Sequence, residues 1–249
     1  MRVLLTGAHG RVGTAVVNHL ADDYEWTLLD REDHPERETV VADVFDRGAV
    51  EDAVAGQDAV VHLAADPGDP GTWESVHDNN LVGCYNVLDA ASEAGVERVV
   101  FASTNHVHGA WQDFHEEELF SGEVVLDDAT PVRPDGLYAA SKVFGEALCR
   151  YYVDYAEAPE RAYAIRIGGV HDPDFDRPTP SRHGPSGWLS RRDCAHLVDR
   201  CLRADGPEFA IFNGVSDNAD RYYDLDYPRQ AVDYLPEDDA SDWDGEEAS

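Results

Sequence analysis

The chain has 249 residues, of which 43% are hydrophobic and 51 are acidic, and its formal net charge is −32. This length and hydrophobic content predict one large or two small folded domains with a sizeable core. The apolar runs and the 10% aromatic residues argue against an acidic disordered chain. The negative charge is spread along the whole chain, which disfavours nucleic acid and anionic membranes as partners.

The four cysteines form no CxxC pair and no cluster with metal-ligand spacing, so we expect buried thiols in a reducing compartment and no metal site. Polar Thr6 and Gly7 interrupt the first apolar run, which argues against a signal peptide. No stretch approaches the ~20 apolar residues that a membrane-spanning helix needs. We therefore expect a cytoplasmic protein.

The chain begins with a short apolar run, Arg2–Thr6, that leads into a glycine-rich turn and then into a stretch with helical periodicity. A strand, a glycine turn and a helix in this order are typical of a dinucleotide-binding unit, in which the helix N-terminus binds phosphate groups. The residues that we expect to bind the cofactor here are Gly7, His9, Gly10, Arg11, Val12 and Gly13.

The next apolar run, residues 26–30, predicts a second strand that ends in Asp30. An acidic residue about 20 positions after the glycine turn is typical of a carboxylate that binds the ribose hydroxyls of NAD. The same carboxylate would repel the 2′-phosphate of NADP, so NAD is favoured. The neighbouring Arg31 could instead accept that phosphate.

Further apolar runs predict strands at residues 39–42, 58–65, 98–103, 162–167 and 208–213, and helical periodicity predicts helices at 80–94, 137–155 and 191–204. This alternation predicts an α/β fold, a Rossmann-type doubly wound parallel sheet of six or seven strands with a small C-terminal substrate-binding portion. Residues 111–136 and 171–187 break the pattern and are typical of loops over an active site, although the first could be a disordered insertion. We expect residues 1–240 to form a single NAD(P)-binding domain and 241–249 to form an acidic flexible tail.

Residues 138–142 read Tyr-Ala-Ala-Ser-Lys, and Lys142 is the only lysine of the chain. Tyr138 lies four positions earlier, so the two side chains share one face of the predicted helix. A cation beside a phenol favours its ionised form, which would lower the pKa of Tyr138 from about 10 toward the range of a general base. This pair predicts a catalytic site.

Together with this pair, TGAHGRVG at residues 6–13, HLAA at 62–65 and FASTNHVHG at 101–109 resemble the extended short-chain dehydrogenase/reductase family. FASTNH and RPDGLYAASKVFGE (133–146) are most similar to uronate dehydrogenases and to the NAD-dependent glucose-6-phosphate dehydrogenases of halophiles. The resemblance implies hydride transfer from C1 of an aldose to NAD, which gives a lactone.

The resemblance also implies a role for individual residues. Tyr138 would be the base, Lys142 would hold the nicotinamide ribose, the Thr104 hydroxyl would bind the substrate oxygen, and Asn80 would support a proton relay. Further cofactor contacts implied in this way are Asp43, Val44, Leu63, Ala64, Ala65 and Ile167.

The substrate contacts that the resemblance implies are Asn105, His106, Gly169 and Arg182. Gly169 stands where uronate dehydrogenases have a serine. His183 stands where they have an arginine, and a one-residue insertion would restore Arg182 to that role. A guanidinium there could bind a carboxylate or a phosphate through two hydrogen bonds.

Several functions remain open on these residues. A uronate or free aldose is the first choice of substrate, followed by glucose 6-phosphate. A nucleotide-sugar epimerase is disfavoured because only about 80 residues follow the sixth strand, which is little room for the usual nucleotide-sugar subdomain. A dinucleotide sensor is disfavoured because Thr104, Tyr138 and Lys142 are all present. The family implies a homodimer through the 137–155 helix, whose apolar stripe includes Phe144 and Tyr155.

We predict that the protein needs high salt to stay folded. Its 51 acidic side chains repel one another in dilute buffer, whereas at about 1 M salt the Debye length falls to about 3 Å and screens that repulsion. Dialysis from molar salt into dilute buffer should therefore reduce the far-ultraviolet circular dichroism. An unchanged spectrum would contradict this prediction.

Overall fold

The computed structural model describes residues 1–34, 36–68, 72–173, 177–179 and 181–242. Its centre is one parallel sheet of seven strands in the order β3-β2-β1-β4-β5-β6-β7. The order reverses between β1 and β4, which is where a doubly wound sheet leaves a crevice at the carboxyl ends of its strands. This arrangement confirms the predicted Rossmann-type fold. The strands are β1 Arg2–Thr6, β2 Glu25–Asp30, β3 Val40–Val41, β4 Ala59–His62, β5 Arg98–Thr104, β6 Arg161–Ile167 and β7 Phe209–Gly214.

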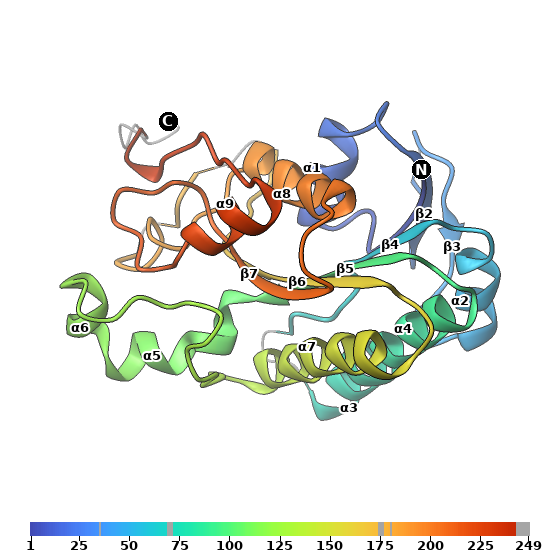
Figure 1. Cartoon of the computed structure of the whole chain (residues 1–249), viewed down its shortest axis with the longest axis horizontal. Coiled ribbons are helices and arrows are strands. Elements are labelled where there is room, and N and C mark those ends of the chain that lie inside the picture. The colour runs from blue at the N-terminus through green and yellow to red at the C-terminus, as the bar shows by residue number, and fades with distance from the viewer. Residues whose placement is uncertain (35, 69–71, 174–176, 180, 243–249) are drawn as a thin grey trace.

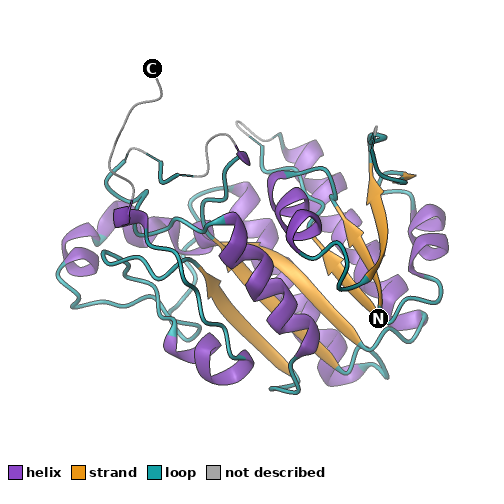
Figure 2. Cartoon of the chain, turned by 90° about the horizontal axis from the view of Figure 1, so that it is seen from above, coloured by secondary structure: helices purple, strands orange, loops and turns teal. Residues whose placement is uncertain are grey.

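Helices cover both faces of the sheet, as Figure 1 shows. One face carries α1 (Arg11–His19), α8 (Arg191–Arg203) and α9 (Asp226–Val232), and the other carries α2 (Arg47–Val54), α4 (Gly83–Glu93) and α7 (Leu137–Tyr155). Seen from above, the strands twist beneath the helices that cross them (Figure 2). No helix in the described part of the chain is long and apolar enough to cross a membrane.

The apolar runs of the central strands reflect two separate cores. Val3 and Leu5 of β1 point into the core under α1 and α8, whereas Leu4 points into the core under α2, α4 and α7. Successive side chains of a strand alternate between faces, so a strand that is covered on both sides must be apolar throughout. Each fully buried leucine contributes about 1.5–3 kcal/mol relative to an exposed one. The four cysteines are buried free thiols, as expected.

The segment 111–136 differs from the prediction of an irregular loop or a disordered insertion. It begins within α5 (Gly109–Phe114), continues into α6 (Glu116–Phe120), and is described throughout. Leu119 is buried and attaches α6 to the main core, while most of the side chains around it are polar. Figure 1 shows both helices beyond the carboxyl ends of the central strands. The segment is therefore an ordered wall of the crevice.

The helix expected to begin at residue 80 starts earlier and is not uniformly α-helical. α3 (Trp73–Ser75) continues into a π-helical turn, Val76–Val82, and then into α4. A π-helical turn shifts the side chains that follow it around the helix axis and is frequent at functional sites. Here the turn contains Asn80, one of the predicted catalytic residues.

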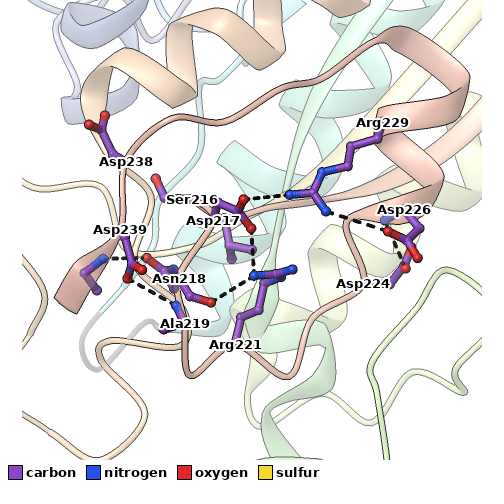
Figure 3. Close-up of polar contacts among 12 residues, drawn as sticks. Ser216, Asp217, Asn218, Ala219, Arg221, Asp224, Asp226, Arg229, Asp238 and Asp239 are labelled. Carbon is purple, nitrogen blue, oxygen red and sulfur yellow. Dashed lines mark hydrogen bonds and ion pairs between the residues drawn. The ribbon is translucent and has the colours of Figure 1, made fainter. Parts of the chain in front are cut away.

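The C-terminal segment is fastened to the domain by polar contacts, which Figure 3 shows in detail. Asp217 forms ion pairs with both Arg221 (2.7 Å) and Arg229 (2.8 Å). The Ala240 N–H donates to Asn218 Oδ1 (3.0 Å). Ordered structure thus continues to a short 3-10 turn at Ala240–Asp242. The predicted flexible tail lies largely at residues 243–249, outside the described residues, and the single-domain boundary at residue 240 stays a prediction.

A buried ion pair joins α7 to the centre of the sheet. Arg166 on β6 donates to both carboxylate oxygens of Glu146 on α7, at 2.9 and 3.0 Å, and the two residues are 2% and 5% exposed. Ser103 on β5 donates to the same carboxylate at 2.6 Å. Ser103 and Arg166 lie opposite each other in the β5–β6 register, next to Thr104 and Ile167. Three elements therefore meet at one carboxylate.

We predict that Glu146→Gln destabilises the protein strongly. The substitution leaves the buried guanidinium of Arg166 without a counter-charge, which typically costs about 3–5 kcal/mol. Asp154→Asn is the matched control, because Asp154 lies on the same helix and pairs with Arg150 at the surface, where an ion pair contributes less than about 1 kcal/mol. Urea denaturation in high salt measures both free energies of unfolding. Similar losses in the two variants would contradict the prediction.

Candidate active site

Two adjoining cavities lie at the carboxyl ends of the strands. The larger has a volume of about 870 Å³ and the smaller about 200 Å³. Gly7, Gly10, Leu63 and Ala65 line both, so the glycine turn after β1 and the end of β4 form the boundary between the cavities. One elongated ligand could therefore extend from one cavity into the other.

The smaller cavity contains the predicted ribose-binding carboxylate. Asp30 lines it, and its two oxygens accept hydrogen bonds from the backbone N–H groups of His9 (2.9 Å) and Arg31 (2.7 Å). His9 does not line either cavity, but its backbone N–H holds the carboxylate of Asp30 in place. Other predicted cofactor residues that line this cavity are Arg31, Asp43, Val44 and Ala64, and Asn79 joins them without having been predicted.

The glycine turn has the close backbone packing that a dinucleotide site needs. Gly7 has a φ of 72°, and a Cβ added there would lie 2.7 Å from the backbone nitrogen of Ala64. Helix α1 starts at Arg11 without a side-chain cap, so its first backbone N–H groups can bind an anion. Gly10, Arg11, Val12 and Gly13 line the larger cavity at this point. This part of the site fits a pyrophosphate.

The larger cavity brings together Thr104, Tyr138 and Lys142. Tyr138 follows Thr104 by 34 residues in the sequence, and Lys142 follows Tyr138 by 4. Thr104 ends β5 and is paired in register with Ile167 at the end of β6, which also lines the cavity. Tyr138 lies in the first turn of α7, and its hydroxyl lies near that of Thr104. A substrate oxygen placed between the two hydroxyls could contact both.

The ammonium group of Lys142 lies beside the rings of Phe101 and Tyr138. The residue is only 3% exposed, and its Nζ lies 4.9 Å from the ring centre of Phe101 and 5.6 Å from that of Tyr138. Burial lowers the pKa of Lys142 to about 8. Phe101 reaches this position because Gly145 has no side chain, since a Cβ there would lie 2.2 Å from the Phe101 ring.

The expectation that Lys142 lowers the pKa of Tyr138 is wrong for the protein alone. Burial raises the pKa of Tyr138 to about 12, and the nearby hydroxyl of Thr104 only partly opposes that rise. Desolvation disfavours the charged phenolate more than its surroundings favour it. Without ligands, Tyr138 is therefore a neutral phenol at pH 7.

Asn80 is a buried residue that lines neither cavity. Its side-chain oxygen accepts from the Asp66 N–H (2.7 Å), and its Nδ2 donates to the Asp66 carbonyl (2.9 Å) and to Ser141 Oγ (3.1 Å). These bonds hold the loop after β4 against α7. Its part in a proton relay stays a prediction.

The substrate end of the larger cavity contains most, but not all, of the predicted contacts. Asn105, His106 and Gly169 line it, whereas Arg182 forms an ion pair with Glu116 and is not among the lining residues. Its neighbour His183, which stands where uronate dehydrogenases have an arginine, lines the cavity instead. Lining residues that were not predicted include Gln112, His171, Thr179, Ser181 and Gly187. Apart from Gln112, they lie in segment 171–187, whose lack of periodicity was the only signal.

Comparison with known proteins agrees with this geometry. The model of the NAD dependent epimerase/dehydratase family matches residues 3–160. The chain belongs to this family. A relative in the family, NAD-dependent glucose-6-phosphate dehydrogenase of Haloferax volcanii, is 40% identical over 97% of this chain and 95% of its own length. The family resemblance inferred from the motifs is therefore confirmed.

Two further members of the family are similar over nearly the whole chain. L-arabinose 1-dehydrogenase (NAD(P)(+)) of Haloferax volcanii is 36% identical over 96% of this chain and 98% of its own. The crystal structure of a uronate dehydrogenase variant from Agrobacterium tumefaciens, complexed with NAD, has a TM-score of 0.82 and is 30% identical, covering 97% of this chain and 86% of that one. Relatives named for three different sugar substrates thus align with nearly the whole chain.

Proposed function

We propose that the protein is an NAD-dependent sugar dehydrogenase that oxidises C1 of an aldose to the lactone. The observation that carries this proposal is the placement of Thr104, Tyr138 and Lys142 at the junction between a dinucleotide-shaped crevice and a polar cavity. The names of the relatives support the same reaction, because they are sugar dehydrogenases.

Each part of the cofactor has residues that fit it. Asp30 would bind the adenosine ribose, the N-terminus of α1 would bind the pyrophosphate, and Lys142 would donate to the hydroxyls of the nicotinamide ribose. The carboxylate of Asp30 favours NAD over NADP. A cytoplasmic location would supply this cofactor and keep the buried thiols reduced.

The chain's own residues would move the proton of the reacting hydroxyl. Thr104 would donate a hydrogen bond to the sugar oxygen at C1 and hold it against Tyr138, whose phenolate would take the hydroxyl proton as the C1–H bond breaks. Bound NAD would accept the hydride, and its positively charged ring would favour the phenolate. Lys142, fixed between Phe101 and Tyr138, would act by holding the nicotinamide ribose in place.

The same site disfavours a dinucleotide sensor. A sensor needs no base, yet Thr104, Tyr138 and Lys142 line the cavity together. A uronate, a free aldose or glucose 6-phosphate are the substrates within the proposed reaction.

We predict that Tyr138→Phe abolishes NADH formation and leaves NAD binding nearly unchanged. The substitution removes only the hydroxyl that takes the proton, whereas the cofactor contacts of Asp30 and Lys142 remain. Steady-state NADH formation with a panel of aldoses, uronates and sugar phosphates measures turnover, and calorimetric titration measures NAD binding. Turnover by the variant at more than a few per cent of the native rate would remove Tyr138 as the base.

The native enzyme should also show a rate that rises with pH. Because the pKa of Tyr138 is raised to about 12 in the free protein, the phenolate fraction near neutral pH is small and grows about tenfold per pH unit. Bound NAD would shift the curve to lower pH without changing its direction. A rate that falls between pH 6.5 and 7.5, below the pKa of about 8 of Lys142, would contradict the assignment.

The protein would act as a homodimer through α7. The outer face of this helix exposes Phe144, Tyr151 and Tyr155 by 39%, 54% and 80%, and Tyr85 on the adjacent α4 is 45% exposed. Tyr151 and Tyr155 stack on each other at 5.7 Å. A row of exposed aromatic side chains on adjacent helices is typical of a protein interface.

Light scattering in high salt tests this interface. We expect twice the 27.5 kDa mass of one chain for the native protein and a monomer for the double variant Tyr151→Glu/Tyr155→Glu, because charged groups cannot be buried in an apolar interface. A native monomer would overturn the dimer. The double variant should keep its circular dichroism, since both side chains are largely exposed.

A further inference from the structure

Three of the basic side chains near the substrate end of the cavity are paired with carboxylates of the chain itself, and another, His171, contacts the Thr179 hydroxyl. Arg182 Nη1 contacts Glu116 Oε2, and His183 Nε2 lies 3.2 Å from the other oxygen of the same carboxylate. Glu116 begins α6, so the ordered wall described above brings this acid to the segment that lines the cavity. A single carboxylate thus pairs with both basic groups.

The position of His183 is fixed on both sides of its ring. Its Nδ1 lies 2.9 Å from the hydroxyl of buried Tyr222, so neither ring nitrogen is left for a substrate anion. Phe120 supports the arrangement, because its ring lies 5.3 Å from that of His183 and 4.5 Å from the Arg182 guanidinium. The pairing therefore belongs to a packed cluster.

A second basic group at the cavity has the same kind of partner. His106 Nδ1 lies 2.6 Å from Asp135 Oδ2. Asp135 is held in place because the extended segment that contains it returns across the turn after β5, where the Arg133 N–H donates to the Val107 carbonyl at 2.8 Å. Two carboxylates, Glu116 and Asp135, thus pair with basic groups at the substrate end, although neither carboxylate lines the cavity itself.

These contacts decide what kind of sugar the cavity accepts. A carboxylate or phosphate on the substrate would find the lining residues His106 and His183 already paired, with the like charges of Asp135 and Glu116 directly beyond them. An uncharged sugar would instead meet hydroxyl and amide groups that suit its own hydroxyls. These groups belong to the lining residues Asn105, Gln112, Thr179 and Ser181.

We infer that the substrate is an uncharged aldose and that Glu116 is the residue that selects it against uronates and sugar phosphates. The inference rests on the proposed dehydrogenase function. Glu116 acts as a specificity-determining residue, because it pairs with Arg182 and His183 and adds a like charge next to a substrate anion. It takes no part in the proton or hydride transfer.

Substrate specificity in high salt tests this inference directly. The assay compares kcat/KM for L-arabinose, D-xylose and D-glucose with kcat/KM for D-glucuronate and glucose 6-phosphate, in the native enzyme, Glu116→Gln and Glu117→Gln. Glu117 is the matched control, because it is the neighbouring acid on α6 and its side chain is exposed.

The native enzyme should prefer an uncharged sugar. Glu116→Gln should raise the kcat/KM ratio of anionic to uncharged sugars at least about fivefold, the factor that corresponds to about 1 kcal/mol for a partly exposed charge pair. Glu117→Gln should leave the ratio within about twofold. Arg182→Ala, a second variant, should leave oxidation of the uncharged sugar within about twofold.

Other results would overturn the inference. A native preference for glucuronate or glucose 6-phosphate that Arg182→Ala removes would show that Arg182 binds the substrate anion. An equal effect of Glu116→Gln and Glu117→Gln would show only long-range charge. NADH formation with none of the sugars would overturn the proposed function itself, which distinguishes that failure from a wrong choice of sugar.

Discussion

The ion pair between Arg166 and Glu146 is the contact on which the geometry of the site depends. Glu146 lies four residues after Lys142 and eight after Tyr138, so the three side chains project from one side of α7. The carboxylate of Glu146 holds Arg166 and Ser103, whose neighbours Ile167 and Thr104 end β6 and β5. The buried ion pair therefore holds the ends of β5 and β6 against α7, and in this way it fixes Thr104 relative to Tyr138. Such a pair costs desolvation, and the bidentate geometry and the third hydrogen bond offset that cost.

The same arrangement explains why a single lysine remains in the chain. The surface carries many carboxylates, and arginine supplies the other fixed cations. At position 142 the cation is buried between Phe101 and Tyr138, and in the described residues no carboxylate pairs with it. A planar guanidinium would bring five donors that need partners in this space, whereas a compact ammonium needs fewer and can reach a ribose. Position 142 thus requires lysine for reasons of shape as well as charge.

Most of the fold could be predicted from the sequence because it depends on periodic patterns. Helix α7 begins and ends where its periodicity predicted, and the carboxylate of Asp30 lies at the strand end where its spacing placed it. The short helices α5 and α6 could not be predicted, because six and five residues are too few to show a helical period. The pairing of Glu116 with Arg182 joins residues 66 positions apart, and nothing local distinguishes this acid from the others. The raised pKa of Tyr138 was missed for a related reason, since burial is set by the tertiary structure.

The central claim is that hydride leaves C1 of an aldose as Tyr138 removes the hydroxyl proton. An aldose that carries deuterium at C1 tests it directly, by mass spectrometry of the reduced cofactor and by the rate of its formation. The account predicts that the deuterium is transferred to NAD, that the sugar product is the lactone, and that the deuterated sugar reacts more slowly in a single turnover. Reduced cofactor without deuterium, or a product oxidised at another carbon, would contradict it.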